Sequence, residues 1–190
     1  MFPGYPSTSG SGKTVGALRT GTEAKAAVAA GWPSLLAAMT AAQINTARRQ
    51  AAFLTTLAFE SQCEYNRRQI SQTRVFYGRG FIQLTGRATD PDADGNVMNY
   101  TPAGAYLGVD LVSVPDRALS LDYSARIAGW YWTKARPGCN GYADNLQMGK
   151  VNAAIGYPLA GSNDADRCMV FGHALATLTG DPVEAVDCAR

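Results

Sequence analysis

The apolar residues of this 190-residue chain recur at the spacing of an α-helix, whereas the strict alternation of a half-buried strand is scarce. The clearest pattern begins at a cap, Asn45 or Thr46, and runs to about Ser61, with Phe53 and Leu57 four positions apart on one face. We therefore expect a mainly α (α+β) fold with a small β element at most.

Glycine and proline mark the limits of the other expected elements. Residues 22–39 are rich in alanine, and Gly31-Trp32-Pro33 predicts a break of this segment into two helices. Residues 1–12 are rich in glycine, proline and serine and are typical of a flexible leader or a linker remnant. We expect residues 13–190 to form a single domain.

Composition limits the classes of partner. Hydrophobic residues make up 46% and charged residues 17%, which predicts a packed core. The net charge of +2 gives no argument for a nucleic-acid partner. No apolar run approaches the roughly 20 residues that span a bilayer, so we expect no membrane insertion. The start of the chain also lacks the pattern of a secretory signal.

The four cysteines, Cys63, Cys139, Cys168 and Cys188, form no C-x-x-C pair, and a zinc site would need unusual spacings. Four cysteines allow three sets of two disulfides, and the sequence does not choose among them. Buried free thiols are the leading interpretation. One disulfide among the last three cysteines is the alternative for a protein that works outside the reducing cytosol.

Two acidic residues, Glu60 and Glu64, continue the apolar stripe of Phe53 and Leu57. A carboxyl group at the edge of a core loses hydration, which disfavours its charged form and suits it to act as a general acid. Alternatively, the helix ends near Ser61 and both acids are solvated, with Glu64 paired to Arg67 or Arg68. Periodicity alone does not make these residues catalytic.

A glycine-rich string, Tyr77-Gly78-Arg79-Gly80-Phe81-Ile82-Gln83-Leu84-Thr85, follows. It predicts a glycine turn that enters a short extended segment. In such a segment Ile82 and Leu84 would face the core, while Gln83 and Thr85 would offer an amide and a hydroxyl group to sugar hydroxyls or a water. Without further context, a hairpin in a core is an equal interpretation.

The string resembles a motif of glycoside hydrolase family 19, which holds plant-type chitinases and bacteriophage endolysins. Matches to the family cover roughly residues 46–177, and include Ala52-Phe53-Leu54, Glu60-Ser61, the string through Arg87, Leu107 to Leu111, Trp130-Tyr131-Trp132, Lys150-Val151-Asn152 and Arg167. The resemblance implies a lysozyme-like, two-lobed helical domain with a small β element lining a glycan cleft.

The resemblance also implies roles for individual residues. Glu60 falls where the family has its general acid, and Thr85 falls where a hydroxyl positions the attacking water. The positions that would bind the sugar are Tyr77, Gln83, Asn99, Asn152 and Arg167. The family inverts configuration and needs a second carboxylate as base, for which Glu64 is the candidate. This chemistry requires no metal or cofactor.

Three departures from the family pattern stand out. Phe59 replaces the histidine that commonly precedes the acid. Glu60 and Glu64 are only four residues apart; helix neighbours have Cβ atoms about 5–6 Å apart, whereas inverting carboxyls lie about 6.5–9.5 Å apart. Either the helix unwinds before Glu64, or another group is the base. The third departure is an insertion that delays Asn99.

The insertion, Asp90-Pro91-Asp92-Ala93-Asp94-Gly95-Asn96, begins like a calcium loop. Its twelfth position is Thr101 in place of the bidentate glutamate of an EF-hand. A plain acidic surface turn is therefore favoured over a calcium site at Asp90, Asp92 and Asp94.

Together these features predict a phage-type endolysin domain that cuts the β-1,4 glycan strands of peptidoglycan as a monomer. The short region between Glu64 and Tyr77 favours this substrate by analogy. The alternatives are a chitinase and, in another class, a non-catalytic glycan-binding module. Made in the host cytoplasm without a signal peptide, such an enzyme would reach the cell wall through holin pores.

Overall fold

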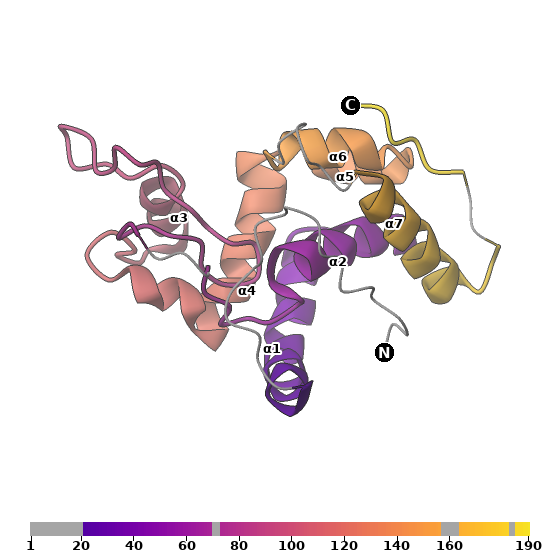
Figure 1. Cartoon of the computed structure of the whole chain (residues 1–190), viewed down its shortest axis with the longest axis horizontal. Helices are drawn as coiled ribbons and strands as arrows, with labels where there is room; N and C mark the ends of the chain where they lie inside the picture. Colours follow the sequence, from indigo (N-terminus) through magenta and orange to yellow (C-terminus); the bar gives the residue numbers. More distant parts are fainter. Residues whose placement is uncertain (1–20, 70–72, 157–163, 183–184) are drawn as a thin grey trace.

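The computed structural model describes residues 21–69, 73–156, 164–182 and 185–190, and is mainly helical as expected (Figure 1). The elements are α1 (Gly21–Ala41), α2 (Ala47–Ser61), α3 (Tyr100–Leu107), the 3-10 helix η1 (Pro115–Leu119), α4 (Leu121–Trp130), the π-helical turn η2 (Tyr131–Ala135), α5 (Cys139–Asp144), α6 (Met148–Ala154) and α7 (Asp164–Thr179). Within these described ranges, the β element is reduced to two isolated antiparallel bridges, Arg68 with Arg79 and Arg79 with Leu84.

The predicted central helix is confirmed as α2. Its N-cap is Thr46, whose side-chain oxygen accepts a hydrogen bond from the Arg49 amide at 3.2 Å. Phe53 and Leu57 are fully buried, and the Phe53 ring meets Trp132 edge-on, with centroids 5.2 Å apart. The helix ends at Ser61 because the backbone of Gln62 turns left-handed, with φ 57°.

The break predicted at Gly31-Trp32-Pro33 is absent, because α1 continues through Pro33. A proline inside a helix removes one backbone hydrogen bond, yet packing compensates here. A Cβ on Gly31 would lie 2.9 Å from the Phe81 ring, so the helix passes close to its neighbours at this point. Leu35 is buried one turn later.

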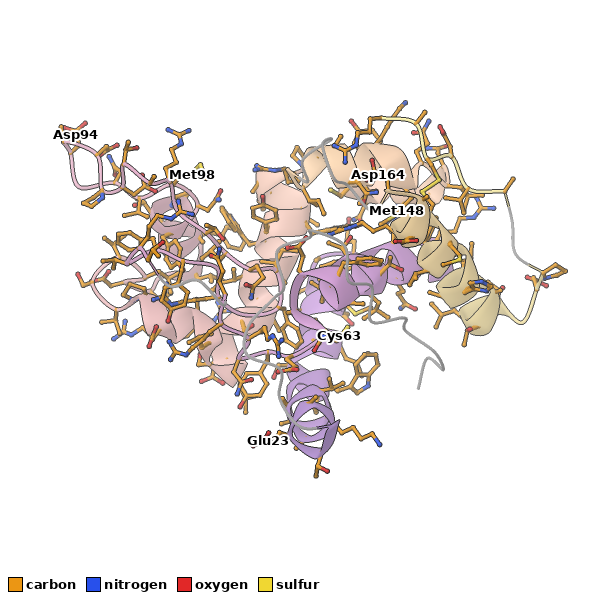
Figure 2. All side chains as sticks on the ribbon, viewed as in Figure 1. Glu23, Cys63, Asp94, Met98, Met148 and Asp164 are labelled. Atoms are coloured by element: carbon orange, nitrogen blue, oxygen red, sulfur yellow. A yellow bond between two sulfur atoms is a disulfide. The ribbon has the colours of Figure 1, made fainter. Side chains whose placement is uncertain are left out.

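Two regions of different construction lie on either side of α1 and α4 (Figure 1). The helical half consists of α2, α5, α6 and α7, which contact one another. The loop arm consists of the described residues between 64 and 120, in which only α3 and η1 are helical. Figure 2 shows Asp94 at the far tip of the loop arm and Met148 and Asp164 within the helical half.

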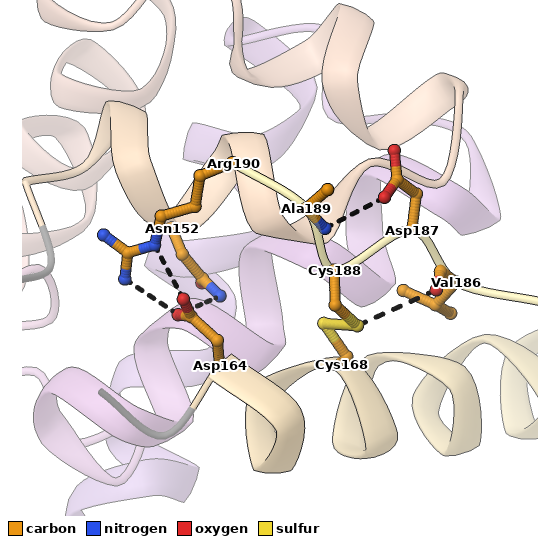
Figure 3. Close-up of a disulfide and its surroundings, with 8 residues drawn as sticks. All are labelled: Asn152, Asp164, Cys168, Val186, Asp187, Cys188, Ala189 and Arg190. Carbon is orange, nitrogen blue, oxygen red and sulfur yellow. Dashed lines mark hydrogen bonds and ion pairs between the residues drawn. A yellow bond between two sulfur atoms is a disulfide. The ribbon is translucent and has the colours of Figure 1, made fainter. Parts of the chain in front are cut away.

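A disulfide between Cys168 and Cys188 joins α7 to the C-terminal residues, which confirms a bridge among the last three cysteines (Figure 3). The Gly149 amide donates to the Asp187 carbonyl at 3.1 Å, and the Asp187 amide donates to the Leu146 carbonyl at 2.9 Å. A side chain on Gly149 would collide with the Cys188 backbone, so only glycine fits there. Cys63 and Cys139 are free thiols.

None of the helices in the described ranges combines the length and the apolar character that crossing a bilayer requires. The leader predicted at residues 1–12 lies outside the described residues.

Candidate active site

The last turn of α2 presents Glu60, whose side chain is 22% exposed. Its Oε1 atom accepts a hydrogen bond from Arg167 Nη2 at 3.0 Å, and Arg167 is fully buried on α7. The Arg167 guanidinium lies 4.8 Å from the centre of the Phe59 ring. The phenylalanine that replaces the family's histidine therefore supports the arginine that holds Glu60.

Tyr131 is a further residue close to Glu60. Burial raises the pKa of the Tyr131 hydroxyl, and the negative charge of Glu60 adds to this rise. The hydroxyl donates to the Ile155 carbonyl at 3.1 Å, and the Arg136 guanidinium lies 4.7 Å from the ring centre. Tyr131 begins the π-helical turn, a distortion that often occurs at functional sites. The sequence match to the family at Trp130-Tyr131-Trp132 indicated this segment but gave Tyr131 no role.

Glu64, the candidate base, lies inside the protein. The left-handed backbone of Gln62 and Cys63 turns the chain away from the helix axis before Glu64. The Glu64 carboxylate is 0% exposed and pairs with Arg67 Nη1 at 3.1 Å. A general base must reach the water it activates, and this burial keeps Glu64 from solvent. The helix end at Ser61 and the pairing with Arg67 follow the alternative interpretation, but the solvent exposure of Glu64 that it included is wrong.

Residues 67–69 connect the end of α2 to the glycine-rich string. The Arg67 carbonyl accepts from the Gly80 amide at 2.8 Å and from Gln83 Nε2 at 3.2 Å. The backbone amide of Gln69 donates to the Gly78 carbonyl at 2.8 Å, and the Gly78 amide donates to the side-chain oxygen of Gln69, also at 2.8 Å. The Glu64–Arg67 pair therefore lies at the junction between the helix that carries Glu60 and the string that carries Thr85.

The string forms a tight hairpin turn, which confirms the second of its two interpretations over the extended segment. Arg79 and Leu84 exchange backbone hydrogen bonds at 3.1 and 2.9 Å, and the turn between them has left-handed φ values at Gly80 (73°) and Gln83 (51°). A Cβ on Gly80 would lie 2.6 Å from the Ala118 carbonyl oxygen, so glycine is required there.

The hairpin brings three predicted site residues together. The Thr85 hydroxyl donates to the Gln83 carbonyl at 2.6 Å, and Asn99 Nδ2 donates to the Thr85 carbonyl at 2.9 Å. A Cβ on Gly78 would lie 2.7 Å from Gln83 Oε1 and 3.1 Å from the Thr85 hydroxyl. The side chains of Gln83 and Thr85 therefore both pack against the backbone of Gly78, where a Cβ would not fit.

Tyr77, predicted to bind sugar, is buried within a polar network around Arg79. The Arg79 guanidinium stacks 3.6 Å from the Tyr77 ring centre, donates from Nε to Asp116 at 2.8 Å, and donates from Nη1 to the Tyr100 hydroxyl at 2.9 Å. Hydrogen bonds from Arg68, above all, hold the pKa of Asp116 below its ordinary value, with Arg79 adding to the effect. Burial raises the pKa of Tyr100 to about 12. Tyr77 therefore belongs to the framework under the hairpin.

Asn152 is fully buried on α6, and its Nδ2 atom donates to Asp164 at 2.9 Å. Asp164 also pairs with Arg190, at 2.6 Å (Figure 3). The Asn152 side-chain oxygen has no hydrogen-bond partner in the described part of the chain. Sequence reasoning named Asn152 and Arg167 but missed Asp164 and Arg190, which no motif indicated.

Two carboxylates of the acidic loop accept hydrogen bonds from backbone amides in or next to the loop. Asp90 accepts hydrogen bonds from the amides of Arg87 and Met98, and Asp92 accepts from those of Asp94 and Asn96. Among the described residues, no group of three or more histidine, cysteine, aspartate or glutamate side chains is placed to hold a metal ion. This geometry is that of the acidic surface turn.

No family model matches the chain. Over 69 residues the chain is 41% identical to the acidic 27 kDa endochitinase of Solanum lycopersicum, and over 70 residues it is 41% identical to chitinase 8 of Oryza sativa subsp. japonica. Each alignment covers 34% of this chain but only 24% and 23% of the two relatives, about a quarter of their length.

Solved structures extend the likeness over most of the chain. Chitinase C from Streptomyces griseus HUT6037 superposes with a TM-score of 0.61 at 20% identity, over 84% of this chain and 72% of that one. A bacterial family 19 chitinase superposes with a TM-score of 0.62 at 19% identity, over 83% of this chain and 90% of that one. These likenesses confirm, over most of the chain, the fold expected from the resemblance to glycoside hydrolase family 19. The likeness in sequence, to two chitinases, covers about a third of the chain.

Proposed function

We propose that this protein is a glycoside hydrolase that cuts β-1,4 linkages in a glycan containing N-acetylglucosamine, with Glu60 as the general acid. The observation that carries the proposal is the placement of Glu60, a partly exposed carboxyl group held by the buried Arg167 at the end of the central helix. The fold of the family 19 chitinases supports it.

In the proposed reaction, Glu60 protonates the leaving glycosidic oxygen while a water attacks the anomeric carbon from the opposite face of the sugar and loses one proton to a neighbouring water. The Thr85 hydroxyl donates its hydrogen bond to the Gln83 carbonyl, so its oxygen lone pairs can accept a hydrogen bond from that water. Glu64 is proposed as a positioning residue in place of the base expected from the sequence, because it is buried under the hairpin and paired with Arg67.

The substrate we propose first is bacterial peptidoglycan, with the protein acting as a monomeric phage endolysin released through pores in the host membrane. The short segment between Glu64 and Tyr77 supports this choice by analogy. Chitin is the second candidate, and the specific observation in its favour is that the named relatives are chitinases.

The test is to incubate the wild type and Glu60→Gln with purified peptidoglycan and with N-acetylglucosamine oligomers. We expect the substitution to lower kcat about 10²- to 10⁴-fold, because glutamine cannot deliver the proton. Near-ultraviolet circular dichroism of both proteins controls for folding. The preferred substrate separates the two candidates. Equal activity of the two proteins would contradict the role of Glu60, and binding without cleavage by the wild type would indicate a non-catalytic module.

A further inference from the structure

The loop arm contains a pocket of about 450 Å³ that the proposed reaction does not use. Its lining comes from the inserted residues, the residues that flank them and the start of α3, and consists of Arg87, Thr89, Asp90, Asp92, Asn96, Val97, Met98, Asn99, Thr101 and Pro102. We call it the insertion pocket, because part of its lining belongs to the inserted segment Asp90 to Asn96. Figure 2 shows Met98 between the tip of the arm at Asp94 and the rest of the molecule.

The loop that forms the insertion pocket is fixed by its own hydrogen bonds. Asp92 and Asn96 close it, with the Asp92 amide donating to the Asn96 carbonyl at 2.9 Å and the Asn96 amide donating to Asp92 Oδ1 at 2.7 Å. At the base of the loop, the Val97 amide donates to the Thr101 hydroxyl at 2.7 Å. A ligand would therefore meet a preformed wall and would not have to order a loop.

The lining has the chemistry that a sugar ring needs. Met98 and Pro102, which are both exposed, supply apolar surface for the C–H face of a ring. The side chains of Thr89 and Asn96 hydrogen-bond to no other residue in the described ranges, so a hydroxyl and an amide remain available to sugar hydroxyls. Asp90 and Asp92 each use one carboxylate oxygen on the backbone, Oδ2 and Oδ1 respectively, and Arg87 Nε donates to the Met98 sulfur at 3.1 Å. A ligand would therefore also meet charged groups, which can hydrogen-bond to sugar hydroxyls.

The insertion pocket adjoins the candidate active site through Asn99. This residue lines the pocket, and its side-chain nitrogen donates to the Thr85 carbonyl at 2.9 Å. A glycan bound beside Thr85 could therefore extend into the pocket. We propose that the insertion pocket is an additional subsite that binds one sugar residue of the β-1,4 glycan, remote from the bond that is cut; this inference rests on the proposed function.

Binding is tested in the Glu60→Gln background, which keeps the oligomers intact. The double variant Asn96→Ala/Met98→Ala removes one hydrogen-bonding group and one apolar contact from the pocket. Calorimetry with hexameric N-acetylglucosamine should show about tenfold weaker binding for this variant. Ala93→Ser, an exposed change in the same loop but outside the pocket lining, should bind like its parent. An unchanged affinity of the double variant would overturn the subsite.

Cleavage separates this inference from the proposed function. In proteins with Glu60 intact, the double variant should cut the tetramer at the wild-type rate and the hexamer with kcat/KM lowered about tenfold. Equal loss on both oligomers would overturn the subsite, because the substitutions would then disturb the catalytic residues. The double variant is also compared with the wild type on peptidoglycan fragments that carry the peptide stem. If it cuts only these fragments more slowly than the wild type, the occupant of the pocket is not a sugar. A wild type that cuts no glycan would refute the hydrolase function, while the calorimetry would still decide the subsite.

Discussion

The helical half and the loop arm hold their candidate site residues by different means. In the helical half, Glu60 sits on a regular helix over an apolar core, and the Cys168–Cys188 bridge fixes the neighbouring α7. In the loop arm, Thr85 sits on a hairpin with little regular structure, and the buried Arg79 ties that hairpin to distant chain segments. Apolar packing of α2 together with the Arg167 ion pair therefore positions the proposed acid, and a polar network positions the proposed water site.

The largest effect is expected at the Glu64–Arg67 pair, where the two regions meet. Glu64→Ala leaves the Arg67 guanidinium, whose side chain is 2% exposed, without this carboxylate, and losses of this kind cost about 3–5 kcal/mol of unfolding free energy. Urea denaturation measures the loss, and activity should fall with stability.

The milder variant Glu64→Gln keeps the shape of the side chain and separates positioning from base catalysis. A positioning role predicts reduced stability with an unchanged pH profile of the remaining activity. A variant of wild-type stability that has lost both activity and one limb of its pH profile would instead identify Glu64 as the base.

The next effect is confined to the helical half. Cys168→Ser opens a bridge between residues 20 positions apart, and the chain-entropy relation gives about 3 kcal/mol for a loop of that length. Hydrogen exchange should accelerate in α6 and α7 while the hairpin amides of Arg79 and Leu84 keep their protection. A reductant should destabilise the wild type to the same extent and leave the variant unchanged; acceleration at the hairpin as well would contradict the separation of the two regions.

The parts of this structure that depend on nearby residues could be predicted from the sequence. Helix α2 follows from its cap at Thr46 and the spacing of Phe53 and Leu57, and the position of Glu60 follows from that helix. The break at Pro33 was predicted and is absent, because packing against Phe81 outweighs the local cost of proline.

The parts that depend on distant partners could not be predicted. Gln83 is in a turn because its side chain binds the Arg67 carbonyl, 16 positions away, and Arg79 pairs with Asp116, 37 positions away. The burial of Glu64 depends on the left-handed turn at Gln62, where the sequence offers no glycine as a signal. The candidate site combines both cases. The helix position of the proposed acid, Glu60, could be predicted from the sequence, while the surroundings of Glu64 could not.

A smaller effect is expected from Arg79→Lys in the loop arm. Lysine keeps the positive charge but lacks the planar fork that serves Asp116, Tyr100 and two backbone carbonyls together. We expect a loss of about 2 kcal/mol, since one or two buried acceptors lose their donor. Hydrogen exchange should accelerate at the hairpin and not in α2 or α7, the reverse of the result for Cys168→Ser. Uniform acceleration across the molecule would show that the two regions unfold as one unit.

The smallest effect is the pH dependence that Asp116 adds to the loop arm. Its pKa is lowered in the folded protein, mainly by Arg68, so its contribution is full above the unfolded pKa of about 4 and is lost as the pH falls through the folded value. Because its side chain is 53% exposed, solvent screens the pair and the contribution stays below about 1 kcal/mol. Thermal melts at pH 6 and pH 3 should show a larger loss for the wild type than for Asp116→Asn, and added salt should reduce the difference. Identical losses at low salt would show that packing alone holds the hairpin in place.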